Sequence, residues 1–390
     1  MKILHTSDWH LGQIFMGRSR ESEHREFLEW LLKLIKEENI DLLIVAGDIF
    51  DTASPPVYAQ KLYYDFLYRL SMTSCKKSII TAGNHDSVSV LNAPKDLLSL
   101  FNIDVVTEEG KIIEFEDILI CAVPYLRERV ILRFVSSQTY KESESALIKG
   151  IKEHYDSLYK EAKKRNKNSI IIATGHLSVL NSATSGSEKE IYIGNLSTIE
   201  SGFFSKRFDY TALGHLHKAQ KAGSDKVRYS GCVIPLSFNE AKYDKSVLLT
   251  EIKNKKIETK EIKIPVFRKL LSIKSSPKEI EEKLKKLKDT KNIWCEVIIQ
   301  GDEKGEFVYK EIIENAQKYD TDILAVKYEK DEIKPLSSSE IEYELESITP
   351  LKVFEKRLEN EDFEDEKLKN SLVTLFKKVL NQTEFGEEMI

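Results

Sequence analysis

The chain has 390 residues and a formal net charge of −5, and 32% of its residues are charged and 41% hydrophobic. This length allows two or three domains, and no apolar run approaches the roughly 18 residues of a membrane span. The segment Met1–Asp8 lacks the basic and apolar regions of a secretion signal, so we expect a cytoplasmic protein.

The charge is unevenly distributed along the chain. Residues 331–390 carry −8 and the preceding body carries +3, which argues weakly against non-specific wrapping of DNA but does not exclude a nuclease. The cysteines are far apart and form no Cys-x-x-Cys pair, so the sequence indicates neither a disulfide framework nor a zinc knuckle. We expect buried, reduced thiols at Cys75, Cys121, Cys232 and Cys295.

The first part of the chain alternates apolar strands with amphipathic helices, which is typical of an α/β domain. Strands are predicted at 2–7, 42–46, 78–82, 118–123, 169–174, 210–213 and 245–252, and helices at 22–38, 57–70 and 93–101. The run Leu42–Ala46 is expected to be buried on both faces of its sheet, because it holds only Leu, Ile, Val and Ala. A loop is expected over Gln13–Arg20.

The pattern changes after residue 265. A lysine-rich stretch predicts a β-α-β-α-β unit, with strands at 269–273, 293–299 and 323–328 and helices at 277–287 and 306–318. We therefore divide the chain into an α/β domain at 1–265, a capping domain at 268–330, a polar linker at 331–346 and a helix pair at 347–385. Acidic residues surround the pair, which favours binding to a partner over packing on the chain's own domains, and both alternatives stay open.

Polar residues of the kinds that bind metals follow five of the predicted strands. A lone Asp or His at such a place more often belongs to a turn or a helix cap. Recurrence at five equivalent places, with five of the eight histidines of the chain, favours one shared site. Its candidate residues are Asp8, His10, Asp48, Asn84, His85, His176, His215 and His217.

The residue types in this set indicate the chemistry. Carboxylate, imidazole and amide ligands suit Mn, Fe or Zn better than Ca, and a set of this size suits two ions that share one bridging carboxylate. His215 and His217 alternate along a segment that we expect to be extended, so both rings should face one side and Leu216 the other. Two ions about 3.5 to 4 Å apart can activate a water and clamp a phosphate. The set therefore predicts hydrolysis of a phosphate ester.

The ordered motifs Asp8-x-His10, Gly47-Asp48, Gly83-Asn84-His85-Asp86, Gly175-His176 and Gly214-His215-x-His217 resemble the calcineurin-like metallophosphoesterase superfamily. The residues that flank these motifs resemble the bacterial DNA nuclease subunits of this superfamily, and so do the stretches Ile191–Gly194 and Ile234–Phe238. The resemblance covers essentially the entire chain. The archaeal and eukaryotic branch carries histidine after Gly-Asp-x-Phe, where this chain has Asp51. The role of Asp51 therefore stays open.

The resemblance implies an α/β fold, a β-sandwich flanked by helices, with two divalent ions, of which manganese is expected. One ion would be held by Asp8, His10, Asp48 and His217, and the other by Asp48, Asn84, His176 and His215. His85 would protonate or stabilise the leaving oxygen. Asp86 is either a partner that orients His85 or a structural residue of the turn.

The resemblance also implies 3' to 5' exonuclease action on duplex ends and endonuclease action on hairpins and single strands, in DNA repair, recombination and replication. Full activity would require an ATP-hydrolysing partner that grips the C-terminal helices. The enzyme would be a homodimer, with residues 57–70 and 91–101 as the candidate dimer surface.

Other charged and titratable residues have simpler expected roles. Arg18, Arg20 and Arg127 lie near ligand loops and are candidates for contacts with DNA phosphates, with a solvated loop as the alternative. Of the remaining histidines, His5 is expected to lie in the core or to contact a ligand residue and not to bind metal itself. His24 and His154 are expected to be structural or exposed.

Two rival functions stay open. The first is a phosphatase or cyclic-nucleotide phosphodiesterase with the same site, but the long segment after His217 exceeds what such an enzyme needs. The second is a protein that tethers DNA ends, and the intact ligand set favours catalysis over this role.

Overall fold

The computed structural model describes residues 1–134, 144–179, 182–184, 188, 199–287, 292–301, 306–318, 322–328 and 372–376. The chain divides into two units, Met1–Tyr328 and Glu329–Ile390. In the second unit the described residues 372–376 are helical. All other elements below belong to the first unit.

Two six-stranded sheets form most of the first unit. The first sheet, in spatial order, contains β14 (Lys256–Lys263), β13 (Ser246–Lys253), β1 (Lys2–Thr6), β4 (Leu42–Ala46), β5 (Lys77–Thr81) and β6 (Ile103–Val106). The second contains β11 (Gln220–Lys221), β12 (Val227–Tyr229), β10 (Tyr210–Gly214), β9 (Ile170–His176), β8 (Ile118–Ala122) and β7 (Lys111–Phe115).

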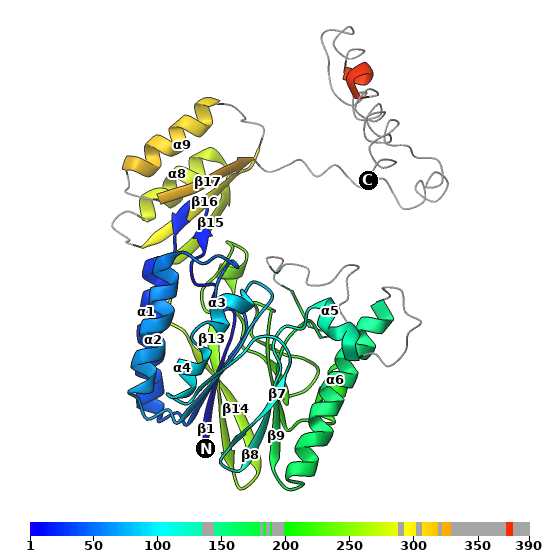
Figure 1. The fold of residues 1–390 in the computed structure, drawn as a ribbon. Coiled ribbons are helices and arrows are strands. Elements are labelled where there is room, and N and C mark those ends of the chain that lie inside the picture. The colour runs from blue at the N-terminus through cyan, green and yellow to red at the C-terminus, as the bar shows by residue number, and fades with distance from the viewer. Residues whose placement is uncertain are drawn as a thin grey trace. The chain divides into compact units, whose positions relative to one another are not determined.

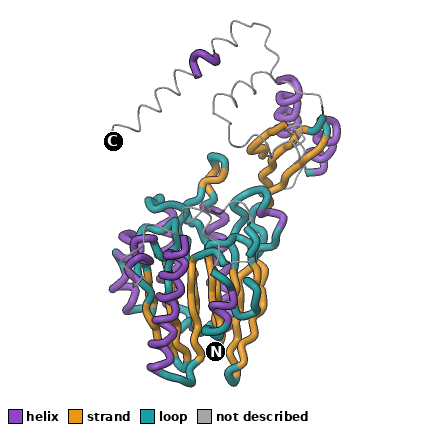
Figure 2. The backbone as a smooth tube through the Cα atoms, turned by 90° about the vertical axis from the view of Figure 1, so that its right-hand side faces the viewer, coloured by secondary structure: helices purple, strands orange, loops and turns teal. Residues whose placement is uncertain are grey.

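The central strands of each sheet run parallel. In the first sheet β1, β4, β5 and β6 pair in parallel, and in the second β8, β9, β10 and β12 do so. Each group therefore brings the carboxyl ends of its strands to one edge. Strand β1 starts near the N-terminus at the bottom of Figure 1, and the strands of both sheets stand roughly upright in Figure 2.

The sheets pack face to face and helices cover their outer faces, which confirms the predicted α/β sandwich. Between the sheets lies an apolar layer that includes Ile44 and Ile79 from the first sheet and Ile120 and Ile172 from the second. The outer face of the first sheet packs on α1 (Glu21–Glu38) and α2 (Val57–Ser71). The outer face of the second packs on α6 (Glu144–Arg165) and α7 (Ser201–Ser205) (Figure 1).

Shorter helices complete this part of the chain. They are α3 (Val88–Asn92), α4 (Lys95–Ser99), α5 (Glu128–Ile131) and the 3₁₀ helices η1 (Leu132–Phe134) and η2 (Glu240–Lys242). The helix expected at 93–101 is present but shorter, because α4 covers Lys95–Ser99 with Pro94 at its N-cap. Helix α3 is separate and precedes the expected range. The loop expected at 13–20 contains a hairpin of β2 (Ile14–Phe15) and β3 (Arg18–Ser19).

The predicted β-α-β-α-β unit is present in the second part of the first unit. It is built of β15 (Lys269–Ser275), α8 (Pro277–Lys286), β16 (Ile293–Ile299), α9 (Glu306–Lys318) and β17 (Asp322–Tyr328). The three strands form a parallel sheet in the order β15-β16-β17. Helix α8 packs Ile280 and Leu284 on one face of this sheet.

The other face of this small sheet contacts the sandwich through an aromatic joint. Trp294 of β16 stacks on Phe15 of the β2–β3 hairpin, with ring centroids 6.0 Å apart and an interplanar angle of 5°. Phe15 also meets Phe238 edge to face at 5.2 Å. Arg268 lies over the Trp294 ring at 4.3 Å and pairs with Glu23 of α1 at 3.2 Å.

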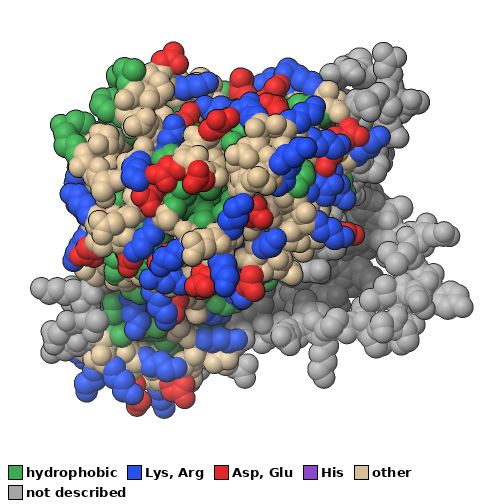
Figure 3. All heavy atoms as spheres, turned by 90° about the horizontal axis from the view of Figure 1, so that it is seen from below, with side chains coloured by type: hydrophobic (Ala, Val, Ile, Leu, Met, Phe, Trp, Pro, Cys, Tyr) green, Lys and Arg blue, Asp and Glu red, His purple; other side chains and the backbone are tan. Residues whose placement is uncertain are grey.

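The amino ends of the strands form a face of mixed charge. Lys76 pairs with Glu116 at 2.8 Å and Lys77 pairs with Asp104 at 2.5 Å, and the face seen from below intersperses basic and acidic side chains (Figure 3). This end therefore presents no surface of one sign among the described residues. Within the same residues, no helix has the length and apolar character required to cross a bilayer.

Candidate metal centre

The predicted ligand residues meet where the carboxyl ends of β1, β4, β9 and β10 converge. Asp8, His10 and Asp48 all have a left-handed backbone, with φ of 51°, 47° and 51°. Non-glycine residues rarely adopt this conformation, and such strain concentrates at functional sites. The neighbours of these ligands hold the loops in place: Trp9 is fully buried and its ring meets Phe66 of α2 edge to face at 5.2 Å.

Two glycines allow the two sheets to approach each other at this edge. A Cβ on Gly214 would collide with the carbonyl oxygen of Ala46, and a Cβ on Gly47 would collide with the ring of His176. Gly47 also has a φ of +89°. The glycine that precedes each ligand is therefore required by space, and at Gly47 also by backbone conformation.

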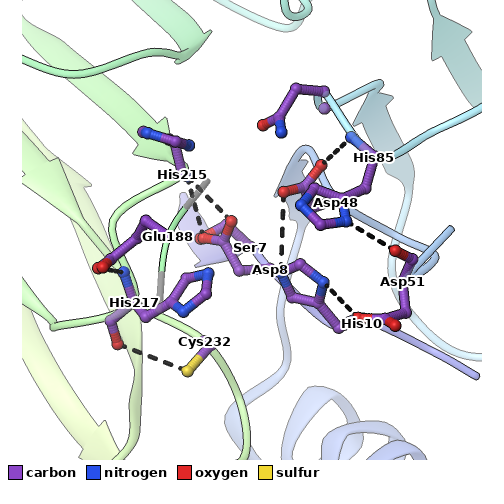
Figure 4. A network of polar contacts seen from close by, with 12 residues as sticks. Ser7, Asp8, His10, Asp48, Asp51, His85, Glu188, His215, His217 and Cys232 are labelled. Carbon is purple, nitrogen blue, oxygen red and sulfur yellow. Dashed lines mark hydrogen bonds and ion pairs between the residues drawn. The ribbon is translucent and has the colours of Figure 1, made fainter. Parts of the chain in front are cut away.

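The first group of potential ligand atoms belongs to Asp8, His10 and His217. One ligand atom from each lies within 4.8 Å of the others, and all three residues are buried. The rings of His10 and His217 lie 5.2 Å apart. Figure 4 shows these side chains gathered beside Asp48.

The second group belongs to Asp8, Asp48 and His176, whose ligand atoms also lie within 4.8 Å of one another. Asp48 Oδ2 is 3.2 Å from His176 Nε2 and 3.7 Å from His10 Nε2, so this carboxylate reaches both groups. Asn84 Oδ1 is 2.9 Å from His176 Nε2.

His215 lies beside the second group. Its ring centroid is 5.5 Å from that of His176, and its amide donates to Asp8 Oδ1 at 2.9 Å. The expectation of an extended segment here is wrong, because His215 has a φ of +95° and lies in a bend. Leu216 nevertheless packs into the apolar cluster behind the second sheet, as the predicted alternation requires.

The donor set fits divalent cations. Burying two carboxylates together is costly unless a positive charge compensates them, and Asp8 and Asp48 are 0% and 1% exposed. Burial raises the pKa of Asp8. Burial alone would raise the pKa of Asp48 and lower that of His176. The attraction between the two groups outweighs burial, so the pKa of Asp48 is lowered and that of His176 is raised to about 9. His10 Nε2 is buried without a hydrogen bond, which leaves an imidazole nitrogen facing Asp48 for an ion to bind.

His85 stands at the edge of this set and is partly exposed. Its amide donates to Asp48 Oδ1 at 2.9 Å, and its Nδ1 lies 2.6 Å from the carbonyl oxygen of Asp51. A carbonyl oxygen only accepts, so Nδ1 carries a hydrogen and proton transfer falls to Nε2. The ring is 4.8 Å from the ring of His10.

Asp86 does not orient His85 through its side chain. Its carboxylate is 1% exposed and accepts from the amides of Ile49, Phe50 and Gly83, at 3.1, 3.0 and 2.8 Å. Burial raises the pKa of this carboxyl to about 6. Asp86 therefore ties the loop after β4 to the loop after β5, which supports the structural alternative.

The structure adds two residues that the sequence did not assign. Asp51 Oδ1 lies 3.2 Å from His10 Nδ1, so Asp51 contacts both His10 and His85 (Figure 4). Glu240 Oε1 lies 2.9 Å from His217 Nδ1. The motif Gly-Asp-Ile-Phe-Asp could have drawn attention to Asp51, and the stretch Ile234–Phe238, which ends two residues before Glu240, could have drawn attention to Glu240.

The three candidate arginines differ in exposure. Arg18 and Arg127 are exposed. Arg20 is fully buried, pairs with Glu23 at 2.6 Å and donates to the carbonyl oxygen of Pro235 at 2.8 Å. The predicted DNA contact of Arg20 is wrong, because its guanidinium lies over the rings of Phe15 and of Trp294 in β16, at 5.3 and 5.6 Å, and is closed off from solvent.

The remaining histidines are structural. His5 is fully buried in β1, where its ring nitrogens contact the Tyr210 hydroxyl at 3.0 Å and the Leu213 carbonyl at 3.2 Å. His24 and His154 are 0% and 6% exposed in α1 and α6. The alternative that they are exposed is therefore wrong.

Comparison with known proteins places the chain among phosphoesterases. A family model described as calcineurin-like phosphoesterase matches residues 1–219. A second, described as type 5 capsule protein repressor C-terminal domain, matches residues 266–362.

Curated relatives match over long stretches. SbcD of the nuclease SbcCD from Escherichia coli strain K12 is 35% identical over 395 residues, covering 98% of each chain. The protein of the same name from Bacillus subtilis strain 168 is 35% identical over 267 residues, which is 65% of this chain and 66% of that protein. Among solved structures, a dimetal phosphatase from Danio rerio covers 67% of this chain and 95% of its own, at 9% identity and a TM-score of 0.41.

Proposed function

Because the chain belongs to the SbcD family of calcineurin-like phosphoesterases, we propose that it is the nuclease component of an SbcCD-type complex. It is a metal-dependent phosphodiesterase that cleaves DNA. The observation that carries this proposal is the convergence of buried carboxylates and imidazoles from both sheets on one edge, with partly exposed His85 beside them.

Two manganese ions are the proposed cofactors. Asp8, His10, Asp48 and His217 would hold one ion, and Asp48, Asn84, His176 and His215 the other. The reach of Asp48 to both His10 and His176 supports its role as the shared ligand. When bound, such a pair supplies a Lewis acid for the phosphate and lowers the pKa of the attacking water.

The protein residues have separate tasks in this reaction. His85 donates its Nδ1 hydrogen to the Asp51 carbonyl, and in its imidazolium form it would give the Nε2 proton to the leaving oxygen and become neutral. Asp51 also fixes the ring of His10. The exposed Arg18 and Arg127 are proposed contacts with DNA phosphates that fix the position of the strand.

The proposed substrates are duplex ends, cut in the 3' to 5' direction, and hairpins or single strands, cut internally. These activities serve DNA repair, recombination and replication in the cytoplasm. The proposed organisation is a nuclease domain at 1–265, a capping domain at 268–330, a linker at 331–346 and a helix pair at 347–385 that binds an SbcC-type ATPase. The linker and most of the helix pair lie outside the described residues.

A homodimer is also proposed, through α2 and the segment that contains α4. Large apolar side chains are exposed on both: Val57 at 81%, Leu97 at 59%, Leu100 at 78% and Phe101 at 48%. Burial of such side chains between two copies would be favourable by about 25 cal/mol per Å².

The test is digestion of an end-labelled duplex and of a hairpin by the purified chain with Mn²⁺, with and without an SbcC-type ATPase. We expect shortening from the 3' end and hairpin opening. His85→Ala should reduce cleavage by roughly 100-fold or more, because it removes a general acid, while Mn²⁺ binding persists. His154→Ala is the control, since that histidine belongs to α6, which packs on the outer face of the second sheet and supplies none of the candidate ligands.

Intact DNA with both proteins and Mn²⁺, together with hydrolysis of a small phosphodiester, would contradict the proposal and favour the phosphatase alternative. Unchanged cleavage by His85→Ala would refute its catalytic role.

A further inference from the structure

Glu240 occupies an unusual position for a carboxylate. It lies in η2, is 0% exposed, and its Oε1 is 2.9 Å from Nδ1 of His217, a proposed metal ligand. A fully buried carboxylate is costly unless every lone pair finds a partner. Both of its oxygens therefore need donors from the surrounding protein.

The second oxygen of Glu240 is held by three donors. Oε2 accepts from Lys245 Nζ at 2.8 Å, from the Leu236 amide at 3.1 Å and from Cys232 Sγ at 3.0 Å. Lys245 is 8% exposed, so its ammonium and the Glu240 carboxylate neutralise each other inside the protein. The carboxylate cannot rotate away from His217 without breaking these contacts.

The contact between Glu240 Oε1 and His217 Nδ1 determines which ring nitrogen of His217 carries the hydrogen. A carboxylate only accepts hydrogen bonds, so the hydrogen of the neutral imidazole must sit on Nδ1. The lone pair is then on Nε2. This nitrogen is the one that can bind an ion in the group formed with Asp8 and His10, whose ligand atoms lie within 4.8 Å of one another.

Glu240, His217 and Cys232 also lie close enough together to suggest a separate cation site. Lys245 excludes this alternative, because its ammonium donates to Cys232 Sγ at 2.9 Å and to Glu240 at 2.8 Å and so takes the place of a cation. The cluster supports the neighbouring centre and does not form a second one.

We propose that Glu240, locked by Lys245, is a positioning residue that fixes the tautomer and ring orientation of His217 for metal binding. This inference rests on the proposed metal centre and adds to it a residue that lies outside the five ligand motifs. Partners of this kind, behind a histidine ligand, typically raise metal affinity about 10- to 100-fold.

The decisive variant is Glu240→Leu with Lys245→Met, because replacing a buried ion pair by apolar residues of similar size leaves no unpaired charge and often preserves the fold. Glu240→Gln alone would leave Lys245 buried and unpaired. The matched control is Glu296→Leu with Lys327→Met, which makes the same replacements at a buried glutamate in the capping sheet, paired at 2.9 Å.

The measurement is titration of the metal-free protein with Mn²⁺, by calorimetry and by the EPR signal of bound Mn²⁺. We expect the Glu240 double variant to lose about 10- to 100-fold in affinity at one of the two sites, and the Glu296 double variant to match wild type. Thermal unfolding of the metal-free proteins checks that each is folded.

A second measurement reports the tautomer of His217 directly, which a general loss of stability would not change. In protein labelled with ¹⁵N-histidine, the His217 signals, assigned with His217→Gln, should show the hydrogen on Nδ1 in wild type and a mixture of tautomers in the Glu240 variant. The His10 signals, whose Nδ1 faces Asp51, should stay unchanged in both.

A folded Glu240 double variant that binds Mn²⁺ as wild type does would overturn the inference, as would a wild-type His217 with its hydrogen on Nε2. Failure of the nuclease proposal is separate: a chain that loads Mn²⁺ through a Glu240-dependent site but leaves DNA intact in the presence of its ATPase would refute only the proposed function.

Discussion

At the scale of single residues, three of the four histidines of the proposed metal centre have Nδ1 against an acceptor. Nδ1 of His10, His176 and His217 meets an acceptor, supplied by Asp51, the Ala46 carbonyl and Glu240. In neutral His10 and His217 rings this places the lone pair on Nε2, whereas Nε2 of His176 also faces an acceptor, Asn84 Oδ1, at 2.9 Å. The His10 and His217 rings are therefore already oriented for the proposed ion, which would reduce the reorganisation that binding requires.

Three buried histidines outside the centre should make the metal-free protein sensitive to mild acid. Burial lowers the pKa of His5 and His24 to about 3 and that of His154 to about 4, from an ordinary value of 6.5. Below pH 6.5 the unfolded chain binds protons that the folded chain does not, so the free energy of unfolding falls as the pH falls. Each of these histidines lowers the free energy of unfolding by at most about 1.4 kcal/mol for each unit by which the pH falls.

Urea unfolding of the metal-free protein at about pH 7.5 and about pH 5.5, on either side of the ordinary histidine pKa, measures this effect. His154→Phe should show a smaller loss than wild type, because Phe cannot take up a proton and keeps the stacking on Phe134 at 4.1 Å. An identical loss in the variant would contradict the assignment to His154.

Sequence alone could pick out the candidate ligands, which the structure brings together, but not the residues that contact them from behind. Asp8 and His217 stand in compact motifs with fixed spacing. Glu240 is far from these motifs in the sequence and contacts His217 only because η2 folds back against the loop that carries His217. Arg20 shows the converse: an arginine in a loop is expected in solvent, and here the capping strands cover it.

At the scale of elements, the approach of β4 and β10 defines the centre. Because a side chain at Gly214 would meet the Ala46 carbonyl, we expect Gly214→Ala to lower the free energy of unfolding by about 1 to 3 kcal/mol or more and to weaken Mn²⁺ binding. The control is Gly202→Ala in α7, where a Cβ would meet nothing within 4 Å.

Urea unfolding and Mn²⁺ titration of both variants give the comparison. Equal effects of the two substitutions would show that space between the sheets is not what requires glycine at 214.

The elements were predictable where hydrophobic periodicity was strong. Helix α1 and the strands β4 and β16 were expected at or near their actual bounds, because their apolar faces are continuous. The edge strand β14 was missed, since its exposed and half-buried residues largely alternate, none is fully buried, and most are charged. The β2–β3 hairpin was also missed, because two-residue strands leave too little pattern.

At the scale of the whole molecule, the first unit is compact without the C-terminal segment. We therefore expect deletion of residues 340–390 to abolish binding of the SbcC-type ATPase and to leave Mn²⁺ affinity unchanged. Co-elution of the truncated chain with the ATPase would contradict the proposed role of the helix pair. The control is His85→Ala in the full chain, which should still co-elute.

The aromatic joint between the capping strands and the sandwich has a thermodynamic consequence. Phe15 follows His10 by five residues and Phe238 precedes Glu240 by two, and both rings belong to the cluster around Trp294. A shift of β15–β17 that moves the Phe238 ring would therefore also move Glu240, which contacts the proposed ligand His217. By linkage, a partner that favours one position of the capping strands changes metal affinity by some factor, and metal binding changes the affinity for that partner by the same factor.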